Sequence, residues 1–177
     1  AMLAATVAEA FRPEADVDSV CRAALDVAPT EPLRTFDERP FGSCHEYLLA
    51  CLEVASKYDD VMAVRAELYE KCLCYHHIDP LELWGLTLAM LKVADADVRQ
   101  TAIGGTNIGR DSDTIAGRGA MLAGILRGAG NVPQEWIDLF PPEALERIYR
   151  NADRLARLVA EQKLTRMMRR QWVANIS

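Results

Sequence analysis

The chain has 177 residues, of which 50% are hydrophobic and 26% are charged, and its formal net charge is −6. This length and composition fit one globular domain with a hydrophobic core and exclude a disordered chain. The negative charge argues against nucleic acid as a partner, and no apolar run reaches the roughly 20 residues that cross a bilayer, so no membrane partner is expected.

Helical spacing dominates the first part of the chain, and polar or proline residues mark where the helices start and stop. Residues 29–42 are rich in proline and are expected to form a loop. Two helices are expected at residues 2–11 and 43–56. Between them, a helix capped by Asp16 or Asp18 is expected to end before Pro29. A fourth helix, capped by Asp59 or Asp60, is expected from Val61 to about Cys74.

The helical pattern continues on both sides of a glycine-rich loop at residues 104–114. Neither an alternating run of strand length nor an internal repeat occurs, so an all-α helical bundle is predicted. The helices expected here are one from Pro80 through Leu91, one from Asp97 to about Ile103, 115–126, and a long helix after Pro141-Pro142. Small side chains on the helix 115–126 predict close packing at Gly117, Ala120, Ala123 and Gly124.

The chain starts inside an apolar helix. Ala1 to Val7 are almost all hydrophobic, and no capping residue precedes them. A natural N-terminus usually has some polar lead-in. We therefore expect the chain to begin within a larger protein.

The loop at residues 104–114 fails three generic motifs for phosphate, calcium or dinucleotide binding. Gly104 and Gly109 have Walker A spacing, but Arg110-Asp111 stands in place of Lys-Ser/Thr, and a carboxylate would repel phosphates. An EF-hand starting at Asp111 lacks its glycine and its final glutamate. A dinucleotide fingerprint starting at Gly117 lacks its third glycine and a preceding strand.

Two interpretations remain for the end of this loop, which places two carboxylates and a hydroxyl before a helix. Hard oxygen ligands of this kind suit Mg²⁺ or Mn²⁺, and the glycines allow tight turns that aim Asp111 and Asp113 at one point. Alternatively, Ser112 or Asp113 caps the next helix. A bare Asp-x-Asp is more often a cap than a metal site, so the decision rests on the flanking sequence.

The flanking sequence from Thr106 to Ala116 closely resembles the C-terminal metal signature of the ADP-ribosylglycohydrolase family, usually Asn-x-Gly-Gly-Asp-Thr-Asp-Thr-Ile-Ala. A small-residue helix around Gly119-Ala120 and a Pro-x-x-Trp turn at Pro133 follow, as in the family. The likeness is specific over residues 79–140. Arg110 replaces the commoner glycine, and Arg118 stands where small apolar residues are usual.

This resemblance implies an all-α fold and a two-metal centre of Mg²⁺ or Mn²⁺. Asp111, Asp113 and Thr114 would be metal ligands, and Asn107 and Arg110 would bind substrate. The implied activity is hydrolysis of the glycosidic bond of ADP-ribose, or of a related ribosyl group, in a modified protein or small molecule.

The same resemblance implies that residues 1–177 are the C-terminal part of one such domain. In the family, the other ligands and a metal-linked glutamate lie in the N-terminal half. Asp59-Asp60-Val61 has the acids of that half without its threonine and is better explained as a cap. We therefore expect the general acid or base, still unassigned, to come from a missing N-terminal segment or a second chain. The chain alone is then expected to be inactive.

A non-catalytic helical module for binding or regulation is the alternative function. Arg110 and Arg118 are the departures from the family pattern that favour it. An enzyme needs Asp111 and Asp113 charged and bound to metal, whereas a scaffold needs them only as helix caps. Metal binding therefore distinguishes the two functions.

Cysteine and histidine offer weaker candidates. Cys72-x-Cys74-x-His76-His77 lacks the second ligand pair that structural zinc requires. Cys44 beside His45 is not thereby a catalytic pair. An odd number of cysteines, together with the absence of a signal peptide, favours reduced thiols and a cytoplasmic location.

Two further features are expected to be structural. Trp84 and Trp136 are more typical of packing than of substrate stacking. The basic residues of the last helix recur at helical spacing and are expected to form a solvated outer face, namely Arg147, Arg150, Arg154 and Arg157.

Overall fold

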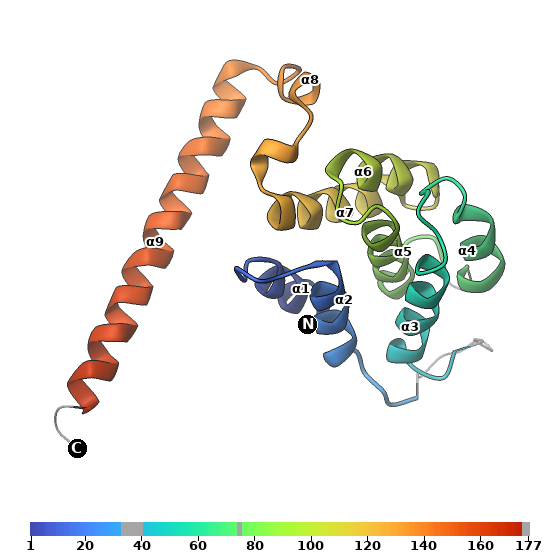
Figure 1. The fold of residues 1–177 in the computed structure, drawn as a ribbon, viewed down its shortest axis with the longest axis horizontal. Coiled ribbons are helices and arrows are strands. Elements are labelled where there is room, and N and C mark those ends of the chain that lie inside the picture. The colour runs from blue at the N-terminus through green and yellow to red at the C-terminus, as the bar shows by residue number, and fades with distance from the viewer. Residues whose placement is uncertain (33–40, 74–75, 175–177) are drawn as a thin grey trace. The chain divides into compact units, whose positions relative to one another are not determined.

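The computed structural model describes residues 1–32, 41–73 and 76–174, with side chains described up to residue 168. Within these ranges the secondary structure is helical, which confirms the predicted all-α fold (Figure 1). The chain divides into two compact units, Ala1–Pro133 and Gln134–Ser177, which are treated separately. Among the described residues, no helix has both the length and the apolar character needed to cross a membrane.

The first unit is built around α5 (Pro80–Val93), whose residues are buried from Leu81 to Leu91. A helix that is apolar on all sides is stable only when other elements surround it. The helices that pack against it are α2 (Val17–Asp26), α3 (Cys44–Ala55), α4 (Arg65–Cys72), α6 (Val98–Asn107) and α7 (Ser112–Arg127). The remaining helix, α1 (Met2–Ala10), packs on α2 and α7.

Helix starts agree with the sequence where a side chain caps the first turn. Asp16 accepts a hydrogen bond from the Ser19 amide at 2.7 Å, and Asp97 accepts one from the Gln100 amide at 2.7 Å. Asp79 caps α5 through the Leu81 amide, with proline in the first turn as predicted. These caps are local, which is why the sequence alone identifies them.

The predicted start of α4 was wrong. The helix begins at Arg65 rather than Val61. The Asp60 carboxylate accepts a hydrogen bond from the Met62 amide at 2.7 Å, two residues on, and residues 61–64 form a turn. Asp60 therefore stabilises a turn instead of capping the helix. Cys74, the expected helix end, and most of the predicted loop 29–42 lie outside the described residues.

The glycine-rich segment is shorter as a loop than predicted, because α6 continues to Asn107 and α7 already starts at Ser112. Gly104 and Gly105 are helical and buried. A Cβ at Gly104 would lie 2.8 Å from Val61 Cβ and Met90 Sδ, and a Cβ at Gly105 would lie 2.6 Å from Ala116 Cα. These glycines serve close helix packing, and only residues 108–111 remain between the two helices.

The predicted packing face of α7 was only partly right. Ala123 is buried, but a Cβ added at Gly117 or Gly124 would meet no described atom within 4 Å. The close approach is made instead by Gly119, where an added Cβ would lie 2.7 Å from Thr101 Cγ2. The packed face of α7 therefore contains Gly119 and Ala123, and Gly117 and Gly124 lie outside it.

A 3₁₀ turn, η1 (Ala129–Asn131), follows α7 at the end of the first unit. The second unit contains α8 (Gln134–Ile137) and the long α9 (Pro142–Ala174). The four arginines predicted to form a solvated face of α9 are exposed. Several of its apolar side chains are exposed as well, among them Ile148, Leu155 and Leu158.

Candidate metal centre

The candidate metal loop, residues 108–111, links α6 to α7 through two residues in the left-handed region. Gly109 has φ +75° and Arg110 has φ +64°. Glycine tolerates this region, whereas a residue with a Cβ is strained there. A Cβ at Gly109 would also lie 3.0 Å from the Tyr69 hydroxyl. The reversal brings Ser112, Asp113 and Thr114 into the first turn of α7.

Asp111 and Asp113 interact at the start of α7. Interaction with Asp111 is the main cause that lowers the pKa of Asp113, and the backbone amide of Thr114 lowers it further. Asp111 occupies the capping position, but its side chain caps no amide of α7. Carboxylate oxygens at a helix N-terminus fit a hard divalent cation.

The capping interpretation explains part of this arrangement, because Asp113 interacts with the amide of Thr114. It leaves the Asp111 side chain unexplained. Among the described residues, no group of three or more His, Cys, Asp or Glu side chains is arranged to hold a metal ion. The loop and the first turn of α7 therefore offer two carboxylates and the Thr114 hydroxyl, which is fewer oxygens than an octahedral ion takes.

Arg110 is bound by a buried carboxylate from α5. Its Nε donates to Glu82 Oε1 at 2.7 Å and its Nη2 donates to Glu82 Oε2 at 3.2 Å. The Glu82 side chain is 0% exposed and that of Arg110 is 26% exposed. This paired hydrogen bonding raises the pKa of Arg110. The sequence analysis did not single out Glu82, whose only signal is that it is the one acid in a largely apolar helix.

The other end of the loop is held by α4. Arg65 Nε donates to the Asn107 carbonyl at 3.0 Å, and the Tyr69 hydroxyl donates to the Ile108 carbonyl at 2.5 Å. These carbonyls stand at the end of α6, where helix carbonyls lose their partners within the helix. The Asn107 side chain donates to the Ile103 carbonyl of its own helix. Both residues predicted to bind substrate, Asn107 and Arg110, thus have partners inside this chain.

Arg118 lies one turn after Thr114 on α7, and its guanidinium carbon is 5.5 Å from the centre of the Trp84 ring. Its Nη1 is buried without a hydrogen-bond partner among the described residues. Trp84 is 6% exposed, as expected for a packing residue. Arg118 therefore packs on the core and leaves one polar atom unsatisfied.

The cysteine candidates lie away from this loop. The Cys72 side chain is buried and interacts with Cys51, which lowers the pKa of Cys72. None of the four described cysteines forms a disulfide, and Cys74 of the zinc candidate lies outside the described residues.

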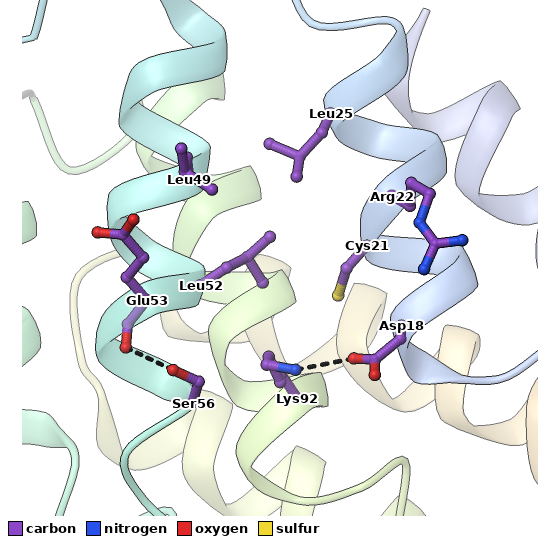
Figure 2. A pocket seen from close by; sticks show the side chains of 9 residues that line it. All are labelled: Asp18, Cys21, Arg22, Leu25, Leu49, Leu52, Glu53, Ser56 and Lys92. Atoms are coloured by element: carbon purple, nitrogen blue, oxygen red, sulfur yellow. Dashed lines mark hydrogen bonds and ion pairs between the residues drawn. The ribbon is translucent and has the colours of Figure 1, made fainter.

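A separate cleft of about 290 Å³ opens between α2, α3 and α5 (Figure 2). Leu25, Leu49 and Leu52 line it, and Lys92 pairs with Asp18 at 2.8 Å at one end. The Cys21 thiol there is buried, and burial raises its pKa to about 12, so it is not a nucleophile near neutral pH. The residues that line the cleft include none from the metal loop, and we assign it no catalytic role.

Comparison with known proteins supports the family that the sequence resembles. The family model described as ADP-ribosylglycohydrolase matches residues 1–165, which include α1 to α8 and most of α9. Comparison with curated proteins and with solved structures gives no significant match. The helical fold agrees with that family, whose members are generally metal-dependent. The chain belongs to the ADP-ribosylglycohydrolase family.

Proposed function

We propose that this chain serves a metal-dependent hydrolase that cleaves the glycosidic bond of ADP-ribose, or of a related ribosyl group, in a modified protein or small molecule. One observation carries the proposal. Asp111 and Asp113 interact at the start of α7, next to the backbone reversal at Gly109 and Arg110 and inside the segment that matches the family. Neighbouring carboxylates repel one another unless a proton or a cation lies between them.

Asp111, Asp113 and Thr114 are the residues that would hold Mg²⁺ or Mn²⁺. Such ions polarise oxygen atoms, orient water and stabilise the charge that develops as the glycosidic bond breaks. Metal binds the ionised carboxylate, and the lowered pKa of Asp113 favours that form. The N-terminus of α7 favours the same charged state.

A complete two-metal centre needs more oxygen ligands than this loop offers. Mg²⁺ prefers six ligands in near-octahedral geometry. We propose that the further ligands and the general acid or base come from an additional N-terminal segment or from a second chain. In that case the 177-residue chain supplies part of the site and is inactive by itself.

Asn107 and Arg110 remain the residues proposed to contact substrate. Their side chains are engaged by the Ile103 carbonyl and by Glu82. Contact with a substrate phosphate or ribose through these groups would require an exchange of partners. The features that favoured a non-catalytic module, Arg110 and Arg118, both have contacts within the chain and need no binding partner to explain them.

The test is an assay of ADP-ribose release from an ADP-ribosylated substrate with Mn²⁺ present. The 177-residue chain is assayed alone and joined to the sequence encoded before Ala1. Turnover is expected only for the longer protein, and Asp113→Asn should abolish it. Turnover by the chain alone would contradict the shared site. A longer protein that binds no metal and releases no ADP-ribose would favour the binding module.

A further inference from the structure

Arg110, the strained residue of the metal loop, is also the residue that forms two hydrogen bonds to the buried Glu82 carboxylate. Arg110 has φ +64°, a conformation that residues with a Cβ rarely adopt. Such a conformation persists only where the surrounding structure holds it. Glu82 provides this hold through two hydrogen bonds to the guanidinium of Arg110.

The anchor of this contact is the most enclosed helix of the first unit. Glu82 is 0% exposed, and the residues on either side of it, Leu81 and Leu83, are buried. A buried carboxylate is costly unless it is paired. The two partners therefore depend on each other, since Arg110 needs support for its backbone and Glu82 needs a cation.

We propose that Glu82 and Arg110 form a positioning pair for the metal loop. The pair holds residue 110 in the left-handed conformation and so fixes where the loop places Asp111 at the start of α7. Arg65 and Tyr69 hold the preceding carbonyls from α4, so the loop is fixed on two sides. The expectation that the pair strengthens metal binding rests on the proposed function. The expectation that the pair keeps the loop ordered does not.

The pair acts on metal through the loop backbone, in the manner of outer residues that orient metal ligands. Loss of either partner is expected to weaken Mn²⁺ binding about 10- to 100-fold, which is typical for such residues. Because both partners also affect stability, a single variant cannot separate positioning from folding. A double-mutant cycle separates the two effects.

The experiment compares wild type, Glu82→Gln, Arg110→Gly and the double variant in the full chain. Arg110→Gly removes two hydrogen bonds to the buried Glu82 carboxylate. It should lower the melting temperature, although glycine relieves the backbone at residue 110. Adding Glu82→Gln should recover most of that loss. Mn²⁺ affinity, measured by electron paramagnetic resonance, should stay reduced in the double variant. Recovery of affinity together with stability would show that the pair is only structural and would overturn the proposal.

Lys92→Gln is the matched control, because it breaks another ion pair of α5, with Asp18, at a distance from the loop. It should leave Mn²⁺ affinity within about twofold of wild type, far from the loss expected at the loop. Arg110→Lys keeps the charge without the forked geometry and should give an intermediate affinity.

Hydrogen exchange separates failure of the pair from failure of the proposed metal site. The Gly109 amide donates to the Thr106 carbonyl, so its protection reports loop order without metal. Glu82→Gln should speed its exchange at least tenfold relative to Lys92→Gln. If wild type binds no Mn²⁺, the proposed metal site fails, and the ratio of the two exchange rates alone tests whether the pair orders the loop. Equal exchange of the Gly109 amide in both variants would overturn the proposed positioning pair.

Discussion

Gly105 of α6 lies against the backbone of Ala116 of α7 so closely that a Cβ at residue 105 would be 2.6 Å from Ala116 Cα. The neighbour here is backbone, which cannot rotate away as a side chain can. This contact determines how close the two helices lie on either side of the metal loop. The loop can be short because its flanking helices almost touch.

Gly105→Ala should therefore destabilise the chain, by about 1–3 kcal/mol on the usual scale of overpacking. Chemical denaturation followed by circular dichroism measures this change. Gly117→Ala is the control, because Gly117 lies in the helix with open space around it. That variant should stabilise by roughly 0.5–1 kcal/mol through helix propensity. Equal effects in both variants would contradict the close contact.

Mn²⁺ should bind the chain through Asp111 and Asp113, weakly because the loop offers few oxygens. Titration calorimetry should show binding in wild type and none in Asp113→Ala. Asp26→Ala, which removes an exposed acid of α2, should bind as wild type does. An unchanged affinity in Asp113→Ala would sink the assignment of the metal ligands.

Glu67 should titrate with a pKa of about 2, because it accepts hydrogen bonds from Lys57, Lys71 and Tyr58. The ordinary value is 4.5, so the folded state holds the ionised form more strongly than the unfolded state. Its contribution to stability is then complete above about pH 4.5 and is lost as the pH falls toward 2. Carboxyl NMR on wild type and on Glu67→Gln identifies the resonance. A midpoint near 4.5 would show that the contacts do not form in solution.

Arg118→Met should leave the free energy of unfolding unchanged or raise it by up to about 1 kcal/mol. The substitution keeps an apolar stem against Trp84 and removes Nη1, which is buried without a partner among the described residues. A buried polar atom that lacks a hydrogen bond costs roughly 1–3 kcal/mol. Thermal denaturation measures the change. A clear loss of stability would mean that the guanidinium has a partner, and the proposed role of Arg118 as a packing residue would then fail.

The sequence by itself determined the helical class and most helix starts. The helix starts at Asp16, Asp79 and Asp97 depend on side chains that cap amides two or three positions away. Local sequence patterns are therefore enough to predict these starts. The sequence also predicts the candidate metal loop, through the likeness from Thr106 to Ala116. Its family membership follows from the match over residues 1–165.

Only the tertiary structure decided which glycines belong to the loop and what holds it. Gly104 and Gly105 look like loop residues locally, yet they belong to α6. They are glycines because Val61, Met90 and Ala116 leave no room for a side chain. Gly124, predicted to pack closely, meets open space instead. Likewise, Arg110 departs from the glycine usual in the family and is held in a left-handed conformation by Glu82, 28 positions away. Contacts between residues so far apart arise from how the helices pack, which no local spacing encodes.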